Sequence, residues 1–125
     1  MARICYIYVL SHLSMPQKAV QSSHVVAELV NSASGDSDWF SCEIKKWASM
    51  EKTIHLYEAG NYAGLLEKIN IISAGASGVP FAVFTEDEAT LHSMKTAVAF
   101  VADLSDAHGP SAAIRELVEK SYFVR

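Results

Sequence analysis

The chain has 125 residues, of which 50% are hydrophobic and 19% are charged, and its formal net charge is −4. This length and composition are typical of one soluble globular domain and argue against a disordered or fibrous chain. The acidic balance disfavours non-specific nucleic-acid binding, which usually depends on a basic surface, but it leaves room for a local basic patch.

Apolar periodicity predicts strands and helices that alternate along the chain in the order β-α-α-β-α-β-β-α. This order predicts a single α/β domain over residues 1–125, with a roughly four-stranded mixed sheet and helices on both faces. No helix separates the last two strands, so one of them is expected to run antiparallel. The elements, in chain order, are a strand at 3–10, helices at 15–31 and 37–48, a strand at 52–58, a helix at 62–72, strands at 80–85 and 96–101, a helix at 110–120 and an apolar tail at 121–125.

No stretch reaches the roughly 18 consecutive apolar residues that a membrane helix needs, and the N-terminal apolar run lacks a signal-peptide cleavage pattern. Cys5 and Cys42 form no CxxC or Cys/His metal spacing, so we interpret both as small buried hydrophobic residues in a reducing compartment. We therefore expect a cytoplasmic protein with no membrane association, no cofactor and no metal.

The first helix carries a lysine in its first turn, where the positive end of the helix dipole disfavours a cation by roughly 0.3–1 kcal/mol. Ser14 and Gln17 match a capping box and Pro16 suits a first turn, which puts Lys18 near the third helical position. One interpretation is that Lys18 and the helix N-terminus jointly hold an anion, such as a phosphate or an oxyanion. The other, which spacing alone somewhat favours, is a solvated lysine whose penalty is offset by a nearby acid.

A second candidate segment follows the third strand, where residues 86–90 read Glu-Asp-Glu-Ala-Thr. Ligands of open α/β sheets bind at the carboxyl ends of strands, where this loop and the loop ahead of Lys18 could meet. Glu86 could act as a general base, while Thr90 could orient water or donate a hydrogen bond. Composition alone favours an ordinary acidic surface loop.

The histidines give little specific information. His24 lies on the first helix beside the apolar stripe, which is more typical of a packing residue than of a ligand. His55 alternates with its neighbours on a strand and is interpreted as structural, and the sequence predicts no role for His12, His92 and His108.

The second helix carries three aromatic residues, Trp39, Phe40 and Trp47, next to Lys45 and Lys46. Such rings could stack on nucleic-acid bases. A stripe at helical spacing is more typical of a core, with the lysines extending to solvent. No glycine-rich loop opens a helix, which excludes a Walker or Rossmann phosphate site.

Several segments share one layout with a known family. YVLSHLSMPQKAVQSSH passes from a strand through a Met-containing loop to a lysine-bearing helix, and NYAGLLEKINIISAGASGVPFAVFT joins a helix to a strand through small residues and a proline. With Trp47 before a lysine-containing strand and the closing HGPSAAIRELVEK, the chain resembles the type II peptidyl-tRNA hydrolases, the archaeal and eukaryotic kind, over most of its length.

The resemblance extends to the family's site motifs. In the helix, the counterparts of the family's residues are Met15, Lys18, Gln21 and His24. In the loop after the third strand, the family has Asp-Ala-Gly-Arg-Thr-Gln, whose Asp and Thr join the helix lysine at the active site. The segment at 86–91 keeps the Thr but has Glu in place of the Asp, has Leu in place of the Gln and lacks the Gly-Arg pair.

The resemblance implies hydrolysis of the ester that joins a peptide to the 3′ ribose of tRNA. It implies Lys18, Glu86 and Thr90 as catalytic residues, Gln21 and His24 as substrate-binding residues, peptidyl-tRNA as the partner and a homodimer. The alternative is a non-catalytic relative that keeps the fold as a binding or oligomerisation module, which the altered acidic loop favours because it would repel a tRNA backbone. A weaker alternative is another ester hydrolase or a binder of a small anion on the same scaffold.

Overall fold

The strands and helices follow one another in the predicted order. A computed structural model describes residues 2–33, 38–86, 94–106 and 109–125. None of its described helices is long and apolar enough to cross a bilayer. The elements are β1 (Ile4–Val9), α1 (Met15–Ser32), α2 (Trp39–Lys46), a π-helical turn η1 (Trp47–Glu51), β2 (Ile54–Glu58), α3 (Tyr62–Ser73), β3 (Phe81–Thr85), β4 (Lys95–Ala102) and α5 (Ala112–Glu119).

The strands form one mixed sheet in the order β2-β1-β4-β3. β1 and β2 are parallel, whereas β4 runs antiparallel to both β1 and β3. The prediction that one of the last two strands runs antiparallel is therefore confirmed. As a consequence, the carboxyl ends of β1, β2 and β3 lie at one edge of the sheet, beside the start of β4. We call this the carboxyl edge.

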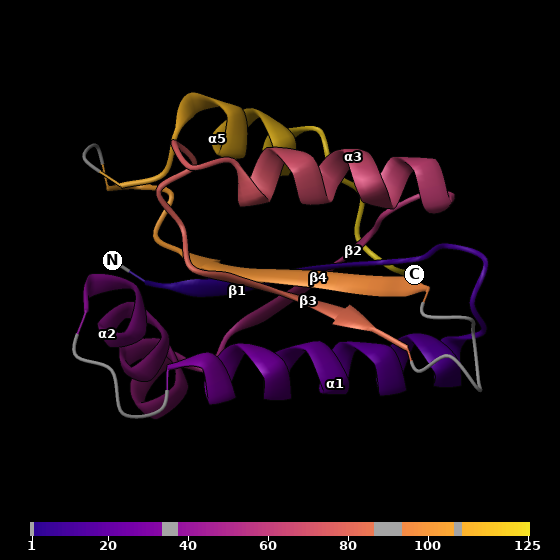
Figure 1. The fold of residues 1–125 in the computed structure, drawn as a ribbon, viewed down its shortest axis with the longest axis horizontal. Coiled ribbons are helices and arrows are strands. Elements are labelled where there is room, and N and C mark those ends of the chain that lie inside the picture. The colour runs from indigo at the N-terminus through magenta and orange to yellow at the C-terminus, as the bar shows by residue number, and fades with distance from the viewer. Residues whose placement is uncertain (1, 34–37, 87–93, 107–108) are drawn as a thin grey trace.

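The helices cover both faces of the sheet, as predicted. α1 and α2 lie on one face, and α3 and α5 lie on the other (Figure 1). Alternate residues of each strand point to opposite faces, so β1 contributes Cys5, Ile7 and Val9 to the core under α1 and α2. The same strand contributes Tyr6 and Tyr8 to the core under α3 and α5.

Each α-helix begins at a polar residue whose side chain accepts a hydrogen bond from the backbone. The capping box predicted for α1 is present: the Gln17 N–H donates to Ser14 Oγ at 3.2 Å and the Ser14 N–H donates to Gln17 Oε1 at 2.9 Å. The last helix differs from the prediction, since Pro110 does not open it but precedes its cap. The caps of the other α-helices are Asp38, Asn61 and Ser111.

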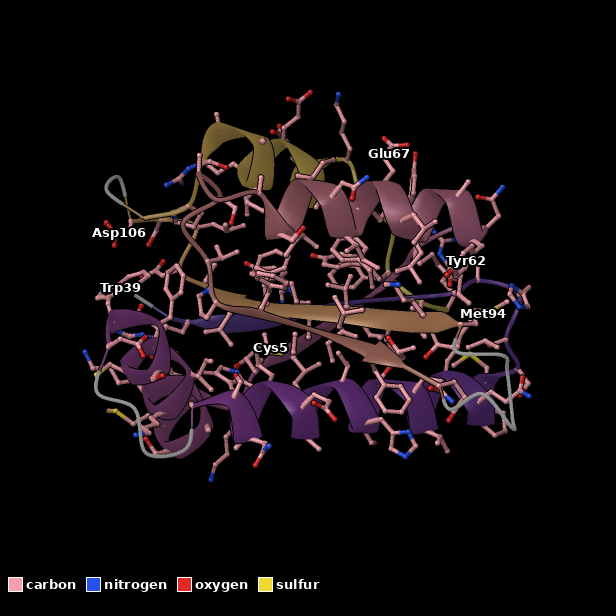
Figure 2. All side chains as sticks on the ribbon, in the orientation of Figure 1. Cys5, Trp39, Tyr62, Glu67, Met94 and Asp106 are labelled. Carbon is pink, nitrogen blue, oxygen red and sulfur yellow. The ribbon has the colours of Figure 1, made fainter. Side chains whose placement is uncertain are left out.

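The second helix is longer than predicted, because η1 continues it to Glu51. It ends at Lys52, which has a left-handed backbone with a φ of 57° and donates its N–H to the carbonyl of Trp47. Trp47 is buried and donates its indole N–H to the Thr53 carbonyl at 2.8 Å. The interpretation of the aromatic stripe as core is wrong for Trp39 and Phe40, whose exposed fractions are 52% and 44%; Figure 2 shows Trp39 beside α2.

The apolar tail packs against β2, a partner that the sequence did not predict. The Glu58 N–H donates to the Tyr122 carbonyl at 2.9 Å, and the Val124 N–H donates to the Leu56 carbonyl at 3.0 Å. Between them, the Phe123 ring stacks on the ring of Tyr57 with centroids 4.7 Å apart. Residues 122–124 therefore extend the sheet beyond the outer edge of β2.

Candidate functional site

The carboxyl edge of the sheet gathers polar side chains from several elements. Lys18 and Gln21 come from α1, Glu58 ends β2, Glu86 follows β3, and Thr96 lies near the start of β4. These five residues form a Lys18–Glu58 ion pair and a Glu86–Gln21–Thr96 hydrogen-bond chain. We call them the edge cluster.

Lys18 is the fourth residue of α1, one position later than predicted, and its side chain is only 7% exposed. Its Nζ lies 3.0 Å from Oε1 and 3.2 Å from Oε2 of Glu58. The interpretation as a solvated lysine is therefore wrong, although the nearby acid that it invoked is present. Glu58 offsets both the helix dipole and the loss of hydration that burial imposes on the ammonium group.

The burial of Lys18 follows from its place on the helix. The buried positions of α1 are 18, 21, 25 and 29, a spacing of three or four residues that marks one helical face. Val25 and Leu29 fill the core, and the same face becomes polar where it reaches the carboxyl edge. Lys18 and Gln21 are thus the polar end of a core-facing stripe.

Gln21 connects two strands through its amide. Its Nε2 donates to Glu86 Oε2 at 2.9 Å, and its Oε1 accepts from Thr96 Oγ1 at 2.7 Å. Thr96 is fully buried, and its hydrogen bond to Oε1 fixes the orientation of the Gln21 amide. The backbone of Glu86 is also held, because its N–H donates to the Met94 carbonyl at 2.9 Å. The position of the Glu86 carboxylate is therefore defined by both its backbone and Gln21.

Of the other predicted site residues, the structure describes His24 alone, and His24 makes none of the edge-cluster contacts. Thr90 lies outside the described residues, as does the rest of the loop at 87–93. His24 is exposed on α1, and its ring packs on Phe84 with centroids 4.6 Å apart. This contact agrees with the interpretation of His24 as a packing residue. The substrate-binding role that the resemblance implies for His24 stays a prediction.

Two members of the edge cluster, Glu58 and Thr96, were not predicted from the sequence. The prediction considered the loops after the first and third strands only. Glu58 is the last residue of β2, and a strand parallel to β1 must end at the same edge of the sheet. That signal could have found Glu58, whereas nothing in the sequence marks Thr96 as different from other buried strand residues.

The surroundings of His55 and Cys5, two further titratable residues, indicate structural roles. The His55 ring makes edge-to-face contacts with Tyr6 and Phe123 at 5.6 Å and 5.3 Å. Cys5 is fully buried, which raises the pKa of its thiol to about 12 and keeps it protonated. Across the described part of the chain, no group of three or more His, Cys, Asp and Glu side chains could hold a metal ion.

The charges of the edge cluster set what it can do. It holds one ammonium group and two carboxylates, so it is not an electropositive site for a phosphate backbone. A positioned carboxylate can orient and deprotonate a water molecule. An ammonium group can stabilise a developing oxyanion if the ligand displaces part of its contact with Glu58.

No protein-family model matches the chain, and no curated protein matches it either. The resemblance to the type II peptidyl-tRNA hydrolases therefore depends on the residues of this chain alone.

Proposed function

We propose that the protein hydrolyses the ester bond of peptidyl-tRNA and releases free tRNA. The observation that supports this proposal is the edge cluster, in which Lys18 and Glu86, far apart in the sequence, lie at one edge of the sheet. These are two of the three residues to which the resemblance assigns catalysis. Thr90, the third, remains a prediction.

Glu86 has the role of the base. Attack of water on the ester carbonyl requires removal of a proton from the water. The Glu86 carboxylate accepts a hydrogen bond from Gln21 at 2.9 Å, which holds it at the carboxyl edge, where the attacking water would be oriented. Thr90 supports the same water with its hydroxyl group. Gln21 then positions Glu86 as well, and the contact with substrate that the resemblance implies for Gln21 stays a prediction.

Lys18 stabilises negative charge on the substrate. As the water attacks, the carbonyl oxygen becomes an oxyanion, and a positioned cation lowers the energy of that state. Glu58 holds the Lys18 ammonium group at the carboxyl edge before substrate binds, at 3.0–3.2 Å. The oxyanion or the terminal phosphate of the tRNA then competes with Glu58 for the ammonium group.

The test is hydrolysis of N-acylated aminoacyl-tRNA by the purified protein and by Lys18→Ala. We expect Lys18→Ala to lower kcat by about 10²-fold or more, the size typical of a lost oxyanion donor. Lys46→Ala is the matched control, because it removes the same charge from an exposed position on α2. It should keep wild-type activity. Glu86→Gln and Thr90→Ala should each lower kcat, with the melting temperature measured for every variant.

Wild-type turnover in a folded Lys18→Ala variant would refute the assigned role of Lys18. Loss of activity in Lys46→Ala to the same degree would show that the assay reports overall charge rather than the edge cluster.

A non-catalytic binding or oligomerisation module is the second candidate. One observation favours it: the Lys18 ammonium group already contacts both oxygens of Glu58. Absence of turnover by the folded wild-type protein would favour this candidate. Binding of tRNA that weakens steeply with salt would then identify a phosphate binder.

The resemblance also supports a cytoplasmic homodimer as part of the proposal. Light scattering on the purified protein should give twice the 13.6 kDa mass of the chain. A mass equal to one chain at micromolar concentration would remove the dimer from the proposal without affecting the reaction.

A further inference from the structure

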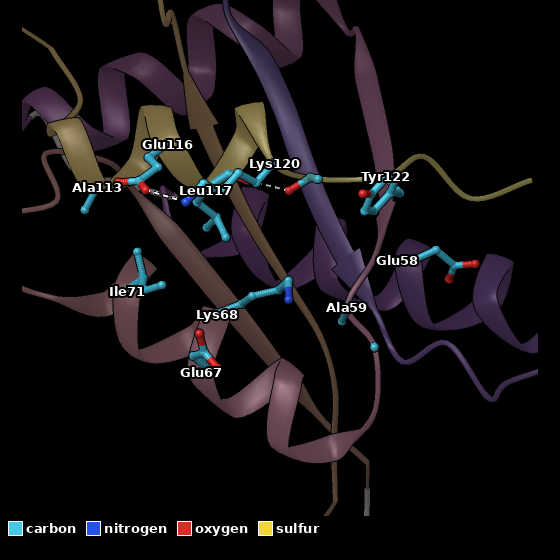
Figure 3. Close-up of a pocket in the computed structure, with 12 residues that line it drawn as sticks. Glu58, Ala59, Glu67, Lys68, Ile71, Ala113, Glu116, Leu117, Lys120 and Tyr122 are labelled. Atoms are coloured by element: carbon cyan, nitrogen blue, oxygen red, sulfur yellow. Dashed lines mark hydrogen bonds and ion pairs between the residues drawn. The ribbon is translucent and has the colours of Figure 1, made fainter.

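A cavity of about 520 Å³ lies between α3 and α5, on the face of the sheet opposite α1 (Figure 3). The turn at residues 59–60 and the start of the tail at 121–122 also line it. This volume lies within the range of about 300–1,000 Å³ that is usual for small-molecule sites. Glu58 lines this cavity and also pairs with Lys18, but no other member of the edge cluster lines it.

The walls of this cavity are largely apolar. Ile71 comes from α3, Ala113 and Leu117 come from α5, and Ala59 comes from the turn after β2. The Tyr122 ring lies among the lining residues and is 74% exposed. Such walls favour a ligand with an aliphatic or aromatic body, since burial of that body removes apolar surface from water.

Two lysines line the cavity, and they differ in their partners. Lys120 is held by Glu116 at 2.6 Å, a contact that raises the pKa of Lys120 and lowers the pKa of Glu116. Lys68 is partly exposed and lies along the cavity in Figure 3. No hydrogen bond or ion pair joins its ammonium group to any described residue. Lys68 is therefore the cation that can accept an anionic ligand.

We propose that this cavity binds a small monocarboxylate with an apolar body. The carboxylate pairs with Lys68, and the body packs between Ile71 and Leu117. A phosphate monoester fits less well: Glu58 and Glu116 are already paired with Lys18 and Lys120, and the remaining carboxylate of the lining, Glu67, repels a second negative charge.

The test is titration of the isotope-labelled protein with sodium octanoate, followed by amide NMR shifts. We expect saturable shifts at the residues of the cavity walls. Lys68→Gln should raise Kd by about tenfold or more, because it removes a charge-assisted hydrogen bond. Lys120→Gln is the matched control and should change Kd less than threefold, since Glu116 already occupies that lysine.

Titrations with other small molecules define the class of ligand. Octylamine and inorganic phosphate should bind more weakly than octanoate. A short apolar peptide with a free C-terminus is compared with the same peptide as its C-terminal amide and with octanoate. Tighter binding of the free peptide would identify a peptide carboxylate as the ligand, and tighter binding of octanoate would identify a free acid. Either result upholds the proposal. Equal Kd values for wild type and Lys68→Gln, tighter binding of octylamine or phosphate, or no shifts at the cavity walls would each overturn it.

Discussion

The two faces of the sheet are built from different side chains of the same central strands. Toward α1 and α2, the strands present small and aliphatic residues, which are Cys5, Ile7, Val9, Ala97, Ala99 and Val101. Toward α3 and α5, they present larger residues and several rings, which are Tyr6, Tyr8, Val98 and Phe100, joined by Tyr57 from β2. One alternating pattern thus produces two unlike layers.

This difference between the two faces explains where the edge cluster and the cavity lie. Small residues on the first face let α1 lie directly against β3 and β4, so Lys18 and Gln21 reach the carboxyl edge. On the second face, the rings of Tyr6 and Phe100 stack with centroids 5.0 Å apart and fill the layer beneath α3 and α5. The edge cluster therefore lies on the face with the smaller side chains, and the cavity lies on the face with the rings.

Among the tests of this comparison, Phe100→Ala should have the largest effect on the free energy of unfolding. Phe100 is fully buried among rings, and its truncation should lower the free energy of unfolding by about 3–5 kcal/mol. Val101→Ala is the matched variant on the opposite face of β4 and should cost roughly 1–3 kcal/mol. Urea unfolding of both variants checks the difference. Equal costs would contradict the view that the rings dominate the stability of this core.

A smaller effect is expected from Gln21→Leu. This change leaves the buried Thr96 hydroxyl without its acceptor and removes one donor from Glu86, at a cost of about 1–3 kcal/mol. Ser23→Ala on the same helix serves as the control, because Ser23 is exposed and bonds only to the Ala19 carbonyl. Its cost should stay within about 0.5 kcal/mol. Indistinguishable unfolding curves for the two variants would show that the hydrogen-bond chain contributes nothing to stability.

The smallest effect concerns alkaline pH and involves both faces. Burial raises the pKa of Cys5 from 9.0 to about 12 and the pKa of Tyr6 from 10.0 to about 12. The unfolded chain ionises first, so stability is intact below the unfolded pKa values and falls as pH rises from about 9 toward about 12. For Cys5 the loss is roughly 1 kcal/mol at pH 10.

Urea midpoints measured between pH 8 and pH 10.5 check this loss. Cys5→Ala and Tyr6→Phe should each make the decline with pH shallower. A decline that is unchanged in both variants would mean that other groups cause it.

Much of the fold could be predicted because its signals are local. The β-branched and aromatic run of β1 and the capping box of Ser14 and Gln17 both depend on neighbouring residues. The π-helical turn η1 could not be predicted, because it accompanies the burial of Trp47, a tertiary effect.

The candidate site was predictable only in part. Lys18, Gln21 and Glu86 were named from the sequence, and the structure describes all three at the carboxyl edge. The pairing of Lys18 with Glu58 depends on the parallel register that sets Glu58 beside Val9 of β1, which no short segment encodes. The catalytic role of Thr90 stays a prediction.

The pairing of residues 122–124 with β2 determines how this sheet can meet another one. A strand with free backbone groups on its outer side can recruit strands from other molecules, and two such sides allow growth in both directions. Here the tail occupies the outer side of β2, and no described segment pairs with the outer side of β3. The tail therefore covers β2 at Leu56–Glu58 and leaves β3 as the strand through which another copy could add to the sheet.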